Sequence, residues 1–480
     1  MIANILSFNL QNIIFSYLLR GLSVILAFLQ GSFSFFGIEV AHQIEIDETV
    51  TYQTFESFGT SSAWWSDELT YADDADYIAS MLYGEDGLNL DVYRFNIGSG
   101  SADNENSRIT DEFNKTESFY VYNETTGEYE YDFSQDANAI AMMEKAIEYG
   151  ASEIILFCNS PHYSMTNNGD SAGSEQEYYV NLPQENYDDF VDYVLTIADW
   201  FVEQGYPVTA ISPINEPQWS WSGENVTQEG CHYELDEAVE LMEMFATQMQ
   251  ERGCEYELSG IESGQMSMDY WDYFESYFDN DVINDFCDTY SGHSYWIDGD
   301  VAGKYVTGLY FAENYPDKSF EMSEWCELPQ EIDAYSIESG IYMANIIVED
   351  LSLLNAVSWQ SWTAVNGDGV INRDLSVLNR YYAYKQFSAF IESGMVRVDV
   401  SDSLGLLSEL ASVAFTDGEK TVYVVVNDSD NAVQINFNND YETSSIYQTS
   451  SSLSCEMIYS GPFETSFNLE SQSITTFVFE

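Results

Sequence analysis

Residues 211–219 read ISPINEPQW. The stretch begins as a short, β-branched apolar run and reaches Asn215 and Glu216 where a strand would open into a loop. A second carboxylate has a similar setting, because SFEMSEWCE (319–327) places Glu324 at the end of another short apolar run. Parallel α/β folds build their sites at the carboxyl ends of their strands. The two glutamates are therefore expected to face one site.

Two carboxyl groups at one site are what cleavage of a glycosidic bond requires. One is held protonated to donate to the leaving oxygen, and the other is ionised to attack or stabilise the sugar. An α/β barrel uses about 30–40 residues per strand–helix unit. The spacing between Glu216 and Glu324 then corresponds to about three units, from strand four to strand seven.

Regular β–α alternation runs through the middle of the chain. Helical periodicity is clearest in 234–253, which ends at Gly253, and it also marks 137–150 and 342–354. Eight repeats predict a (β/α)8 TIM barrel over residues 53–391. The strand-like runs are 56–64, 91–98, 153–160, 208–216, 256–264, 288–296, 319–327 and 355–364. The long loops expected to build the site are 99–133, 161–184, 217–233 and 365–375.

After about residue 392 the apolar pattern changes to a period of two. Residues 42–55 alternate in the same way, so the pattern predicts a fused antiparallel β-sandwich side domain made of 42–52 plus 392–480. The run KTVYVVVND (420–428) is apolar on both faces, which indicates a central strand covered on each side. The other expected strands are 395–401, 412–417, 433–438 and 474–480.

The amino terminus resembles a targeting segment. Residues 1–41 contain one basic residue, Arg20, followed by the apolar run 21–37 and the small residue Ala41. This order predicts a secretory signal peptide and an extracellular protein. The alternative is an uncleaved signal-anchor, which would tether the protein to a membrane.

The charge balance excludes one class of partner. The 480 residues contain 13 Lys and Arg against 82 Asp and Glu, a formal net charge of −69. Such a surface repels phosphates and anionic polysaccharides, so nucleic-acid binding is not expected. Aromatic residues make up 16% of the chain, more than a core usually requires, and flat rings suit sugar-binding clefts. A monomer acting on a poly- or oligosaccharide is expected.

The six cysteines and four histidines do not suggest a metal site. No C-x-x-C pair exists and the histidines are scattered, so neither a metal nor a cofactor is expected. Cys158 and Cys326 fall in apolar runs and are expected to be buried free thiols. Cys231 either pairs with Cys287 or stays free.

Ordered sequence blocks between residues 52 and 327 resemble glycoside hydrolase family 30. The resemblance implies a barrel with a fused β-domain, retention of anomeric configuration, Glu216 as acid/base and Glu324 as nucleophile. The form NEPQW…QEGC is most similar to the endo-β-1,6-galactanase and β-1,6-galactobiohydrolase branch, which acts on arabinogalactan side chains. The blocks are YQTFESFGTSSAWW (52–65), YRFNIGSG (93–100), CNSPHYSMTNNG (158–169), ISPINEPQWSW (211–221), QEGCHY (228–233), SGHSYW (291–296) and MSEWCE (322–327).

The chain departs from the family pattern in two blocks. CNSPHYSM stands where members often read SNSPPYWM, so His162 and Ser164 replace a proline and a tryptophan. FESFG replaces the commoner FEGFG. Loss of the tryptophan removes a sugar-stacking ring and bears on subsite preference more than on chemistry.

Further side chains at strand ends are candidates for substrate contact. Asn215 could donate to the sugar 2-hydroxyl, or it could cap the strand-end turn. Arg94, in so acidic a chain, is expected to pair with Glu324 and keep it ionised. His293 and Tyr295 either orient Glu324 or touch substrate, with a structural core histidine as the alternative. The expected cleft-wall rings are Trp64, Trp219, Trp296 and Trp362.

Several alternatives stay open from the sequence. Glu262, near the end of the fifth strand-like run, is the alternative nucleophile. Another family 30 activity is possible, namely a glucuronoxylanase, a β-1,6-glucanase or a β-glucosidase/xylosidase type. A glucuronate-reading enzyme needs a basic pocket, for which Arg373 and Arg380 are available, but a chain this acidic attracts acidic xylan poorly. A non-catalytic carbohydrate-binding surface protein is disfavoured by the glutamate pair beside Asn215.

Overall fold

The computed structural model describes residues 41–480, except 69–70, 72, 225, 329–330 and 405–407. The targeting segment expected at 1–41 lies outside the described residues, apart from Ala41. Among the helices of the described part, none is long and apolar enough to cross a membrane.

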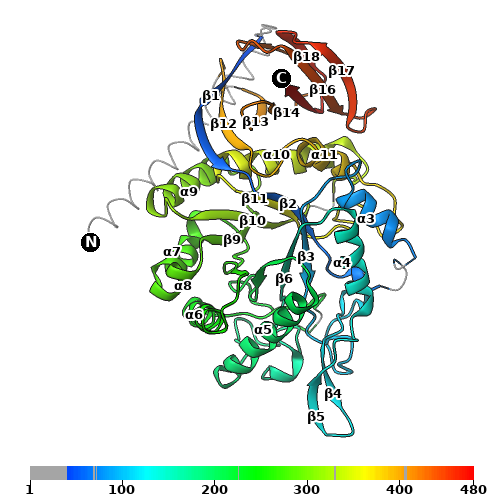
Figure 1. Cartoon of the computed structure of the whole chain (residues 1–480), viewed down its shortest axis with the longest axis vertical. Coiled ribbons are helices and arrows are strands. Elements are labelled where there is room, and N and C mark those ends of the chain that lie inside the picture. Colours follow the sequence, from blue (N-terminus) through cyan, green and yellow to red (C-terminus); the bar gives the residue numbers. More distant parts are fainter. Residues whose placement is uncertain (1–40, 69–70, 72, 225, 329–330, 405–407) are drawn as a thin grey trace.

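Eight parallel strands form a curled sheet in the larger body of the molecule (Figure 1). Each falls within one of the eight predicted strand-like runs, and β7 and β10 are the fourth and seventh in chain order. Across the sheet the order is β8, β7, β6, β3, β2, β11, β10, β9. The strands are β2 (Ser57–Ser61), β3 (Val92–Asn96), β6 (Glu153–Phe157), β7 (Val208–Ser212), β8 (Glu257–Leu258), β9 (Thr289–His293), β10 (Ser319–Trp325) and β11 (Ser358–Ser361).

Helices between these strands cover the outer face of the sheet (Figure 1). Helix α6 shows how the sequence sets their bounds: Glu234 and Glu237 form a capping box at its start, and Gly253 ends it with φ of +70°. The helices are α3 (Ala75–Tyr83), α4 (Ala137–Tyr149), α5 (Tyr187–Gln204), α6 (Leu235–Arg252), α7 (Trp271–Asp279), α8 (Asp281–Phe286), α9 (Val301–Asn314), α10 (Ile337–Leu353) and α11 (Asn379–Ser388).

The two edge strands, β8 and β9, are not joined by a continuous ladder. Strand β8 has two residues, whereas a strand over 256–264 is predicted from the sequence. The chain beyond β8 instead runs beside β9 through isolated bridges such as Ser263 with Gly292. A Cβ at Gly260 would lie 2.4 Å from the backbone of β9, so only glycine allows this close approach. The prediction of a closed barrel is therefore confirmed in part. The eight strands form a curled sheet, but no continuous ladder joins β8 to β9.

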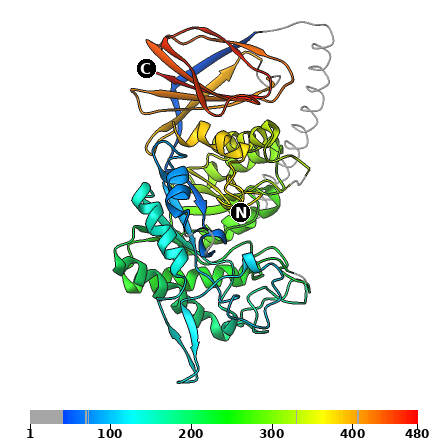
Figure 2. The same cartoon turned by 90° about the vertical axis from the view of Figure 1, so that its right-hand side faces the viewer.

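The loop expected at 99–133 contains a hairpin that the sequence analysis did not predict. Strands β4 (Tyr120–Asn123) and β5 (Glu128–Tyr131) pair in antiparallel fashion, and the hairpin projects from the body at the end opposite the β-rich domain (Figure 2). The segment YVYNETTGEYEY alternates aromatic and polar residues around a turn that ends in glycine, which is a hairpin signal.

The remaining strands form a separate β-rich domain at the other end (Figures 1 and 2). They make one continuous nine-stranded sheet, antiparallel except for the β1–β15 pair, and the folded-over shape of this sheet is consistent with the predicted sandwich. The ring centroids of Tyr423 in β14 and Phe437 in β15 lie 5.7 Å apart, although these two strands are not neighbours in the sheet. The sheet therefore folds over on itself. The serine-rich β16–β18 region was not predicted. The strands are β1 (His42–Thr54), β12 (Val396–Asp402), β13 (Leu410–Thr416), β14 (Thr421–Asn427), β15 (Val433–Phe437), β16 (Thr443–Thr449), β17 (Glu456–Pro462), β18 (Ser466–Leu469) and β19 (Ser473–Phe479).

Strand β14 is apolar on both faces because it separates two cores. Tyr423 and Val425 belong to the core inside the β-rich domain. Val422, Val424 and Val426 belong to the core of the larger body, where β13, β14 and β19 pack on α10. The β-rich domain thus covers apolar surface that the larger body would otherwise expose.

Truncation after residue 391 is therefore expected to yield insoluble or poorly active protein. Burial of each large apolar side chain contributes roughly 1.5–3 kcal/mol, and several would be exposed at once. Solubility, thermal melting and turnover of the truncated chain measure the effect. A truncated chain that melts and turns over like the full chain would show that the β-rich domain is only an appendage.

Acidic side chains gather at the amino-terminal ends of the parallel strands. Burial raises the pKa of Glu153 and Glu321 to about 7 each, and repulsion from neighbouring carboxylates adds to the effect. Glu321 accepts hydrogen bonds from Ser291 and Gln360, both at 2.8 Å, inside the sheet. Each of these carboxyls is easier to bury protonated than charged.

Glu321→Gln is expected to stabilise the protein above pH 7 and to leave its stability near pH 4 unchanged. A carboxyl whose folded pKa lies above its unfolded pKa contributes stability below about pH 4.5, and this contribution is lost as the pH rises through about 7. The difference is on the order of 3 kcal/mol at most. Denaturant unfolding of both proteins at pH 4.5 and pH 8 measures it. Equal stability of the two proteins at pH 8 would contradict the prediction.

Candidate active site

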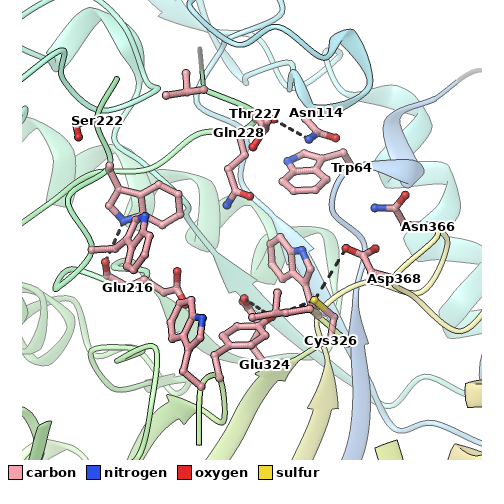
Figure 3. Close-up of a pocket in the computed structure, with 17 residues that line it drawn as sticks. Trp64, Asn114, Glu216, Ser222, Thr227, Gln228, Glu324, Cys326, Asn366 and Asp368 are labelled. Carbon is pink, nitrogen blue, oxygen red and sulfur yellow. Dashed lines mark hydrogen bonds between the residues drawn. The ribbon is translucent and has the colours of Figure 1, made fainter. Parts of the chain in front are cut away.

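Glu216 lies four residues beyond β7, in a backbone conformation that is rare outside glycine. Its φ is +44°, and three hydrogen bonds hold this left-handed turn. Its own N–H donates to the carbonyl oxygen of Glu262 at 3.0 Å, while its carbonyl oxygen accepts from Trp219 N at 3.0 Å and from Trp221 Nε1 at 2.9 Å. The turn directs the Glu216 carboxyl into the cleft that Figure 3 shows.

Glu324 is held from two sides at the end of β10. Arg94 Nη1 donates to Oε2 at 3.0 Å, which is the ion pair expected from the sequence, and the Tyr295 hydroxyl donates to Oε1 at 3.1 Å. Burial raises the pKa of Glu324, and although His293 and Arg94 counteract it, the net direction is upward. The expectation that Arg94 by itself keeps Glu324 ionised is therefore too simple, because burial and the nearby charge of Glu216 oppose it.

His293 lies between the carboxylates and is completely buried. Nδ1 lies 3.2 Å from Glu216 Oε1 and 3.7 Å from Glu324 Oε1, while Nε2 lies 3.0 Å from Glu262 Oε2. Burial alone would lower the pKa of His293, but the surrounding carboxylates raise it to about 10. The ring is thus an imidazolium at neutral pH, and both nitrogens donate.

Glu262 anchors this network and does not line the cleft. It accepts from Arg94 Nη2 at 3.1 Å and from Ser212 at 2.6 Å, and Ser323 also donates to it. Burial by itself would raise the pKa of Glu262, but the charge of Arg94 and the partners around it lower the pKa to about 2. The geometry therefore disagrees with Glu262 as the alternative nucleophile, since its oxygens are occupied below the cleft.

Glu216, His293 and Glu324 each offer an atom that could ligate a metal, and these atoms lie within 4.8 Å of one another. In the described structure these side chains bond to one another instead, with His293 Nδ1 3.2 Å from Glu216 Oε1 and 3.7 Å from Glu324 Oε1.

A cavity of about 480 Å³ opens above the two glutamates (Figure 3). Glu216 lies at one end, Glu324 is central, and Asp368 and Asn366 lie at the other end. The lining residues are Trp64, Asn114, Glu216, Trp219, Trp221, Ser222, Val226, Thr227, Gln228, Tyr295, Trp296, Glu324, Cys326, Leu328, Trp362, Asn366 and Asp368.

The four expected tryptophans line this cavity in two different ways. Trp219 and Trp296 are each 50% exposed and stack on one another, with centroids 5.3 Å apart and planes at 8°. Trp64 and Trp362 are buried and meet edge to face at 5.4 Å. The first pair forms a flat, accessible surface at the rim, and the second pair forms a wall.

Three residues expected to bind substrate do not line the cavity. Arg94 and His293 are buried beneath it and act on the glutamates. Asn215 is also buried, and its amide oxygen has no hydrogen-bond partner. Tyr295, in contrast, both lines the cavity and donates to Glu324.

The polar lining residues of the loops were not among the predicted site residues. Asn114, Gln228, Asn366 and Asp368 come from three different loops that follow strands, and nothing in their local sequence distinguishes them from other loop residues. Gln228 precedes Glu229, a fully buried carboxylate that accepts from Thr116 at 2.8 Å and so ties two of these loops together. The QEGC block, which was used only for the family resemblance, is the one sequence feature that could have indicated Gln228 as a site residue.

The departures at His162 and Ser164 lie away from this cavity. His162 is buried, its Nδ1 lies 2.8 Å from the Ser164 hydroxyl, and burial lowers its pKa to about 3. Neither residue lines the cavity. All six cysteines are free, and Cys158 and Cys326 are buried as expected.

The family model for O-glycosyl hydrolase family 30 matches residues 41–324, more than half of the chain. The chain belongs to glycoside hydrolase family 30. It is a glycosidase that acts on polysaccharide, and the cavity with its two glutamates is the candidate active site of this family 30 enzyme.

Similar proteins agree with this membership. An endo-beta-1,6-galactanase from Hypocrea rufa is 25% identical over 424 residues, which cover 82% of each chain. A conserved exported protein from Bacteroides fragilis has a TM-score of 0.80 at 24% identity and covers 91% of this chain and 99% of its own. A family 30 endoxylanase from Clostridium papyrosolvens has a TM-score of 0.70 at 22% identity and covers 92% and 100%. These two structures show the shared fold.

Proposed function

We propose that this family 30 enzyme cleaves β-1,6-linked galactan, such as the side chains of arabinogalactan, by a retaining double displacement. Glu216 is the acid/base and Glu324 is the nucleophile. The observation that carries the mechanism is that the two carboxyls face one cavity with oxygens within 4.8 Å of each other. Retaining glycosidases hold their carboxyls about 5–5.5 Å apart, whereas inverting enzymes need about 6.5–9.5 Å to admit a water molecule.

The contacts of Glu324 support this division of roles, because Arg94 and Tyr295 donate to both of its oxygens and so favour its ionised form against the effect of burial. The acid role requires a proton on Glu216, and in that state Arg94 and His293 balance the negative charges of Glu262 and Glu324. Because His293 Nδ1 donates to Glu216 Oε1, the transferable proton resides on Oε2. Loss of this proton would leave three buried carboxylates facing two cations.

The first step joins Glu324 to the anomeric carbon while Glu216 gives its proton to the leaving oxygen. Arg94 and Tyr295 keep the Glu324 carboxylate oriented for this attack. In the second step Glu216 takes a proton from water, which then releases the sugar from Glu324. Asn215 lies directly before the acid/base, and its unpartnered Oδ1 could accept a hydrogen bond, whereas the predicted contact with the sugar 2-hydroxyl is a donation from its amide nitrogen.

The lining of the cavity supports a neutral substrate. Among the described residues that line it there is no lysine or arginine. Arg380, a candidate for reading glucuronate, is buried and donates to Glu327 and to two backbone carbonyls instead. Arg373 lies over the ring of Phe113, 3.6 Å from its centroid, and does not line the cavity. The galactanase relative supports β-1,6-galactan among neutral substrates.

A substrate panel tests the proposal. The purified enzyme is assayed on β-1,6-galactan, β-1,6-glucan, glucuronoxylan and aryl β-glycosides, with Glu324→Gln as the inactive control. Highest kcat/KM on β-1,6-galactan is the expected result. A preference for β-1,6-glucan or glucuronoxylan would contradict the proposed substrate but not the proposed mechanism. No activity on any of these substrates would contradict the proposed chemistry of the enzyme.

The first product is expected to keep the β configuration at its anomeric centre. Two inversions, one on Glu324 and one by water, restore the starting configuration. Proton NMR during early turnover distinguishes the anomers before they interconvert in solution. An α anomer as the first product would exclude the double displacement.

A further inference from the structure

We infer that Asp368, together with Trp64, forms a hydroxyl-binding subsite that holds the glycone sugar and determines which sugar the enzyme accepts. This inference deepens the proposed function and rests on the roles assigned there to Glu216 and Glu324. The glycone is the sugar whose anomeric carbon meets Glu324. Because Glu216 must lie beside the leaving oxygen, the glycone extends from Glu324 toward the end of the cavity that Asp368 occupies (Figure 3).

Two buried polar atoms at this end have no partner in the described part of the chain. Asp368 Oδ1, an acceptor, is buried without a hydrogen bond, and so is Trp64 Nε1, a donor. Both residues line the cavity. An unpaired buried polar group costs about 1–3 kcal/mol, so a native cleft retains such groups where a ligand satisfies them. Sugar hydroxyl groups can donate to the first atom and accept from the second, whereas a carboxylate cannot donate and an apolar group can do neither.

Hydrogen bonds hold the loop that carries Asp368 in place, as a binding residue requires. Arg380 bonds to the backbone on both sides of Asp368: Nη2 donates to Gly367 O at 2.6 Å, and Nε donates to Gly369 O at 2.7 Å. Asn366 N also donates to Ile371 O at 2.9 Å. The Arg380 guanidinium bonds to the backbone and to Glu327 and forms no ion pair with Asp368, although its charge and that of Arg373 partly oppose the rise in the pKa of Asp368.

The other neighbours of Asp368 leave it available to a ligand. Cys326 Sγ lies 4.0 Å from Oδ2, the Asn366 side chain and the backbone of Asp368 also bond to the carboxyl, and no ion pair of Asp368 occurs among the described residues. Burial raises the pKa of Asp368, which indicates a desolvated site where a hydrogen bond to the carboxylate is strong. A sugar that carries a carboxylate at this point would meet a second negative charge and be rejected.

The test determines whether Asp368 contacts one of the hydroxyl groups of the glycone. Wild type, Asp368→Ala, Asp368→Asn and the control Asp374→Asn are assayed on an aryl β-1,6-galactobioside and on its monodeoxy analogues, altered one hydroxyl at a time in the glycone ring. Asp374 belongs to the same loop but is exposed, and it accepts from Ser376. Thermal melting confirms that each variant is folded.

One deoxy analogue is expected to lose about 10- to 100-fold in kcat/KM with wild type and with Asp374→Asn, as for a hydrogen bond to a charged group. Asp368→Ala should show the same loss of kcat/KM on the parent compound, relative to wild type. Its kcat/KM on that deoxy analogue should equal its kcat/KM on the parent compound. Equal deoxy penalties in wild type and Asp368→Ala would overturn the inference. If wild type cleaves only the glycosides of another sugar, the proposal of galactan as the substrate is wrong. The role of Asp368 is then tested by the same comparison with the monodeoxy analogues of that sugar.

Discussion

Glu324→Gln is expected to abolish turnover of every glycoside, with a loss on the order of 10⁴-fold or more in kcat. The amide cannot form the glycosyl ester, whatever the leaving group. The fold should survive, because Arg94 keeps its ion pair with Glu262 and the Tyr295 hydroxyl can still donate to the amide oxygen. Steady-state kinetics on an activated aryl glycoside and on polysaccharide measure the loss.

The matched control lies in the same strand. Glu321→Gln also removes a buried carboxyl from β10, three residues before Glu324 and outside the cavity, and is expected to retain activity. Azide offers a positive test, because this small anion can enter the space left in Glu324→Ala and form an α-glycosyl azide. Substantial residual hydrolysis by Glu324→Gln with a retained product would show that another carboxylate is the nucleophile.

The parts of the site that the sequence predicted lie close to regular strands. Glu216 and Glu324 stand at the ends of apolar runs, and the position of a residue after a parallel strand determines which edge of the sheet it reaches. The Arg94–Glu324 pair followed from charge alone, since a buried arginine needs a carboxylate. In both cases a local pattern was sufficient.

The orientation of the buried charges could not be predicted in the same way. Arg94 and His293 stood among the candidates for substrate contact, with contact to Glu324 as the other expectation, and they lie beneath the cavity and bridge Glu262 to the two glutamates. Whether a side chain at a strand end points into the sheet or into the loops depends on the curl of the sheet. That curl is set by packing between distant segments, including the close approach at Gly260.

Loop residues were the least predictable part of the site. Asp368 stands in a short glycine-containing turn, which is held by hydrogen bonds from Arg380, a helix residue outside the loop. The Trp219–Trp296 stack likewise joins loops that follow β7 and β9. Contacts between separate loops carry no periodic signal in a single sequence, so the polar lining appears only in three dimensions.

Glu216→Gln is expected to reduce hydrolysis of polysaccharide by about 10²- to 10⁴-fold and to spare the first step on aryl glycosides with good leaving groups. Only a poor leaving group needs the proton that Glu216 Oε2 supplies. Kinetics across a series of leaving-group pKa values, with Glu224→Gln as an exposed control from the same loop, should give a steep dependence in the Glu216 variant alone. Equal losses on dinitrophenyl glycosides and on polysaccharide would argue against the acid role and leave Glu216 a structural partner of His293.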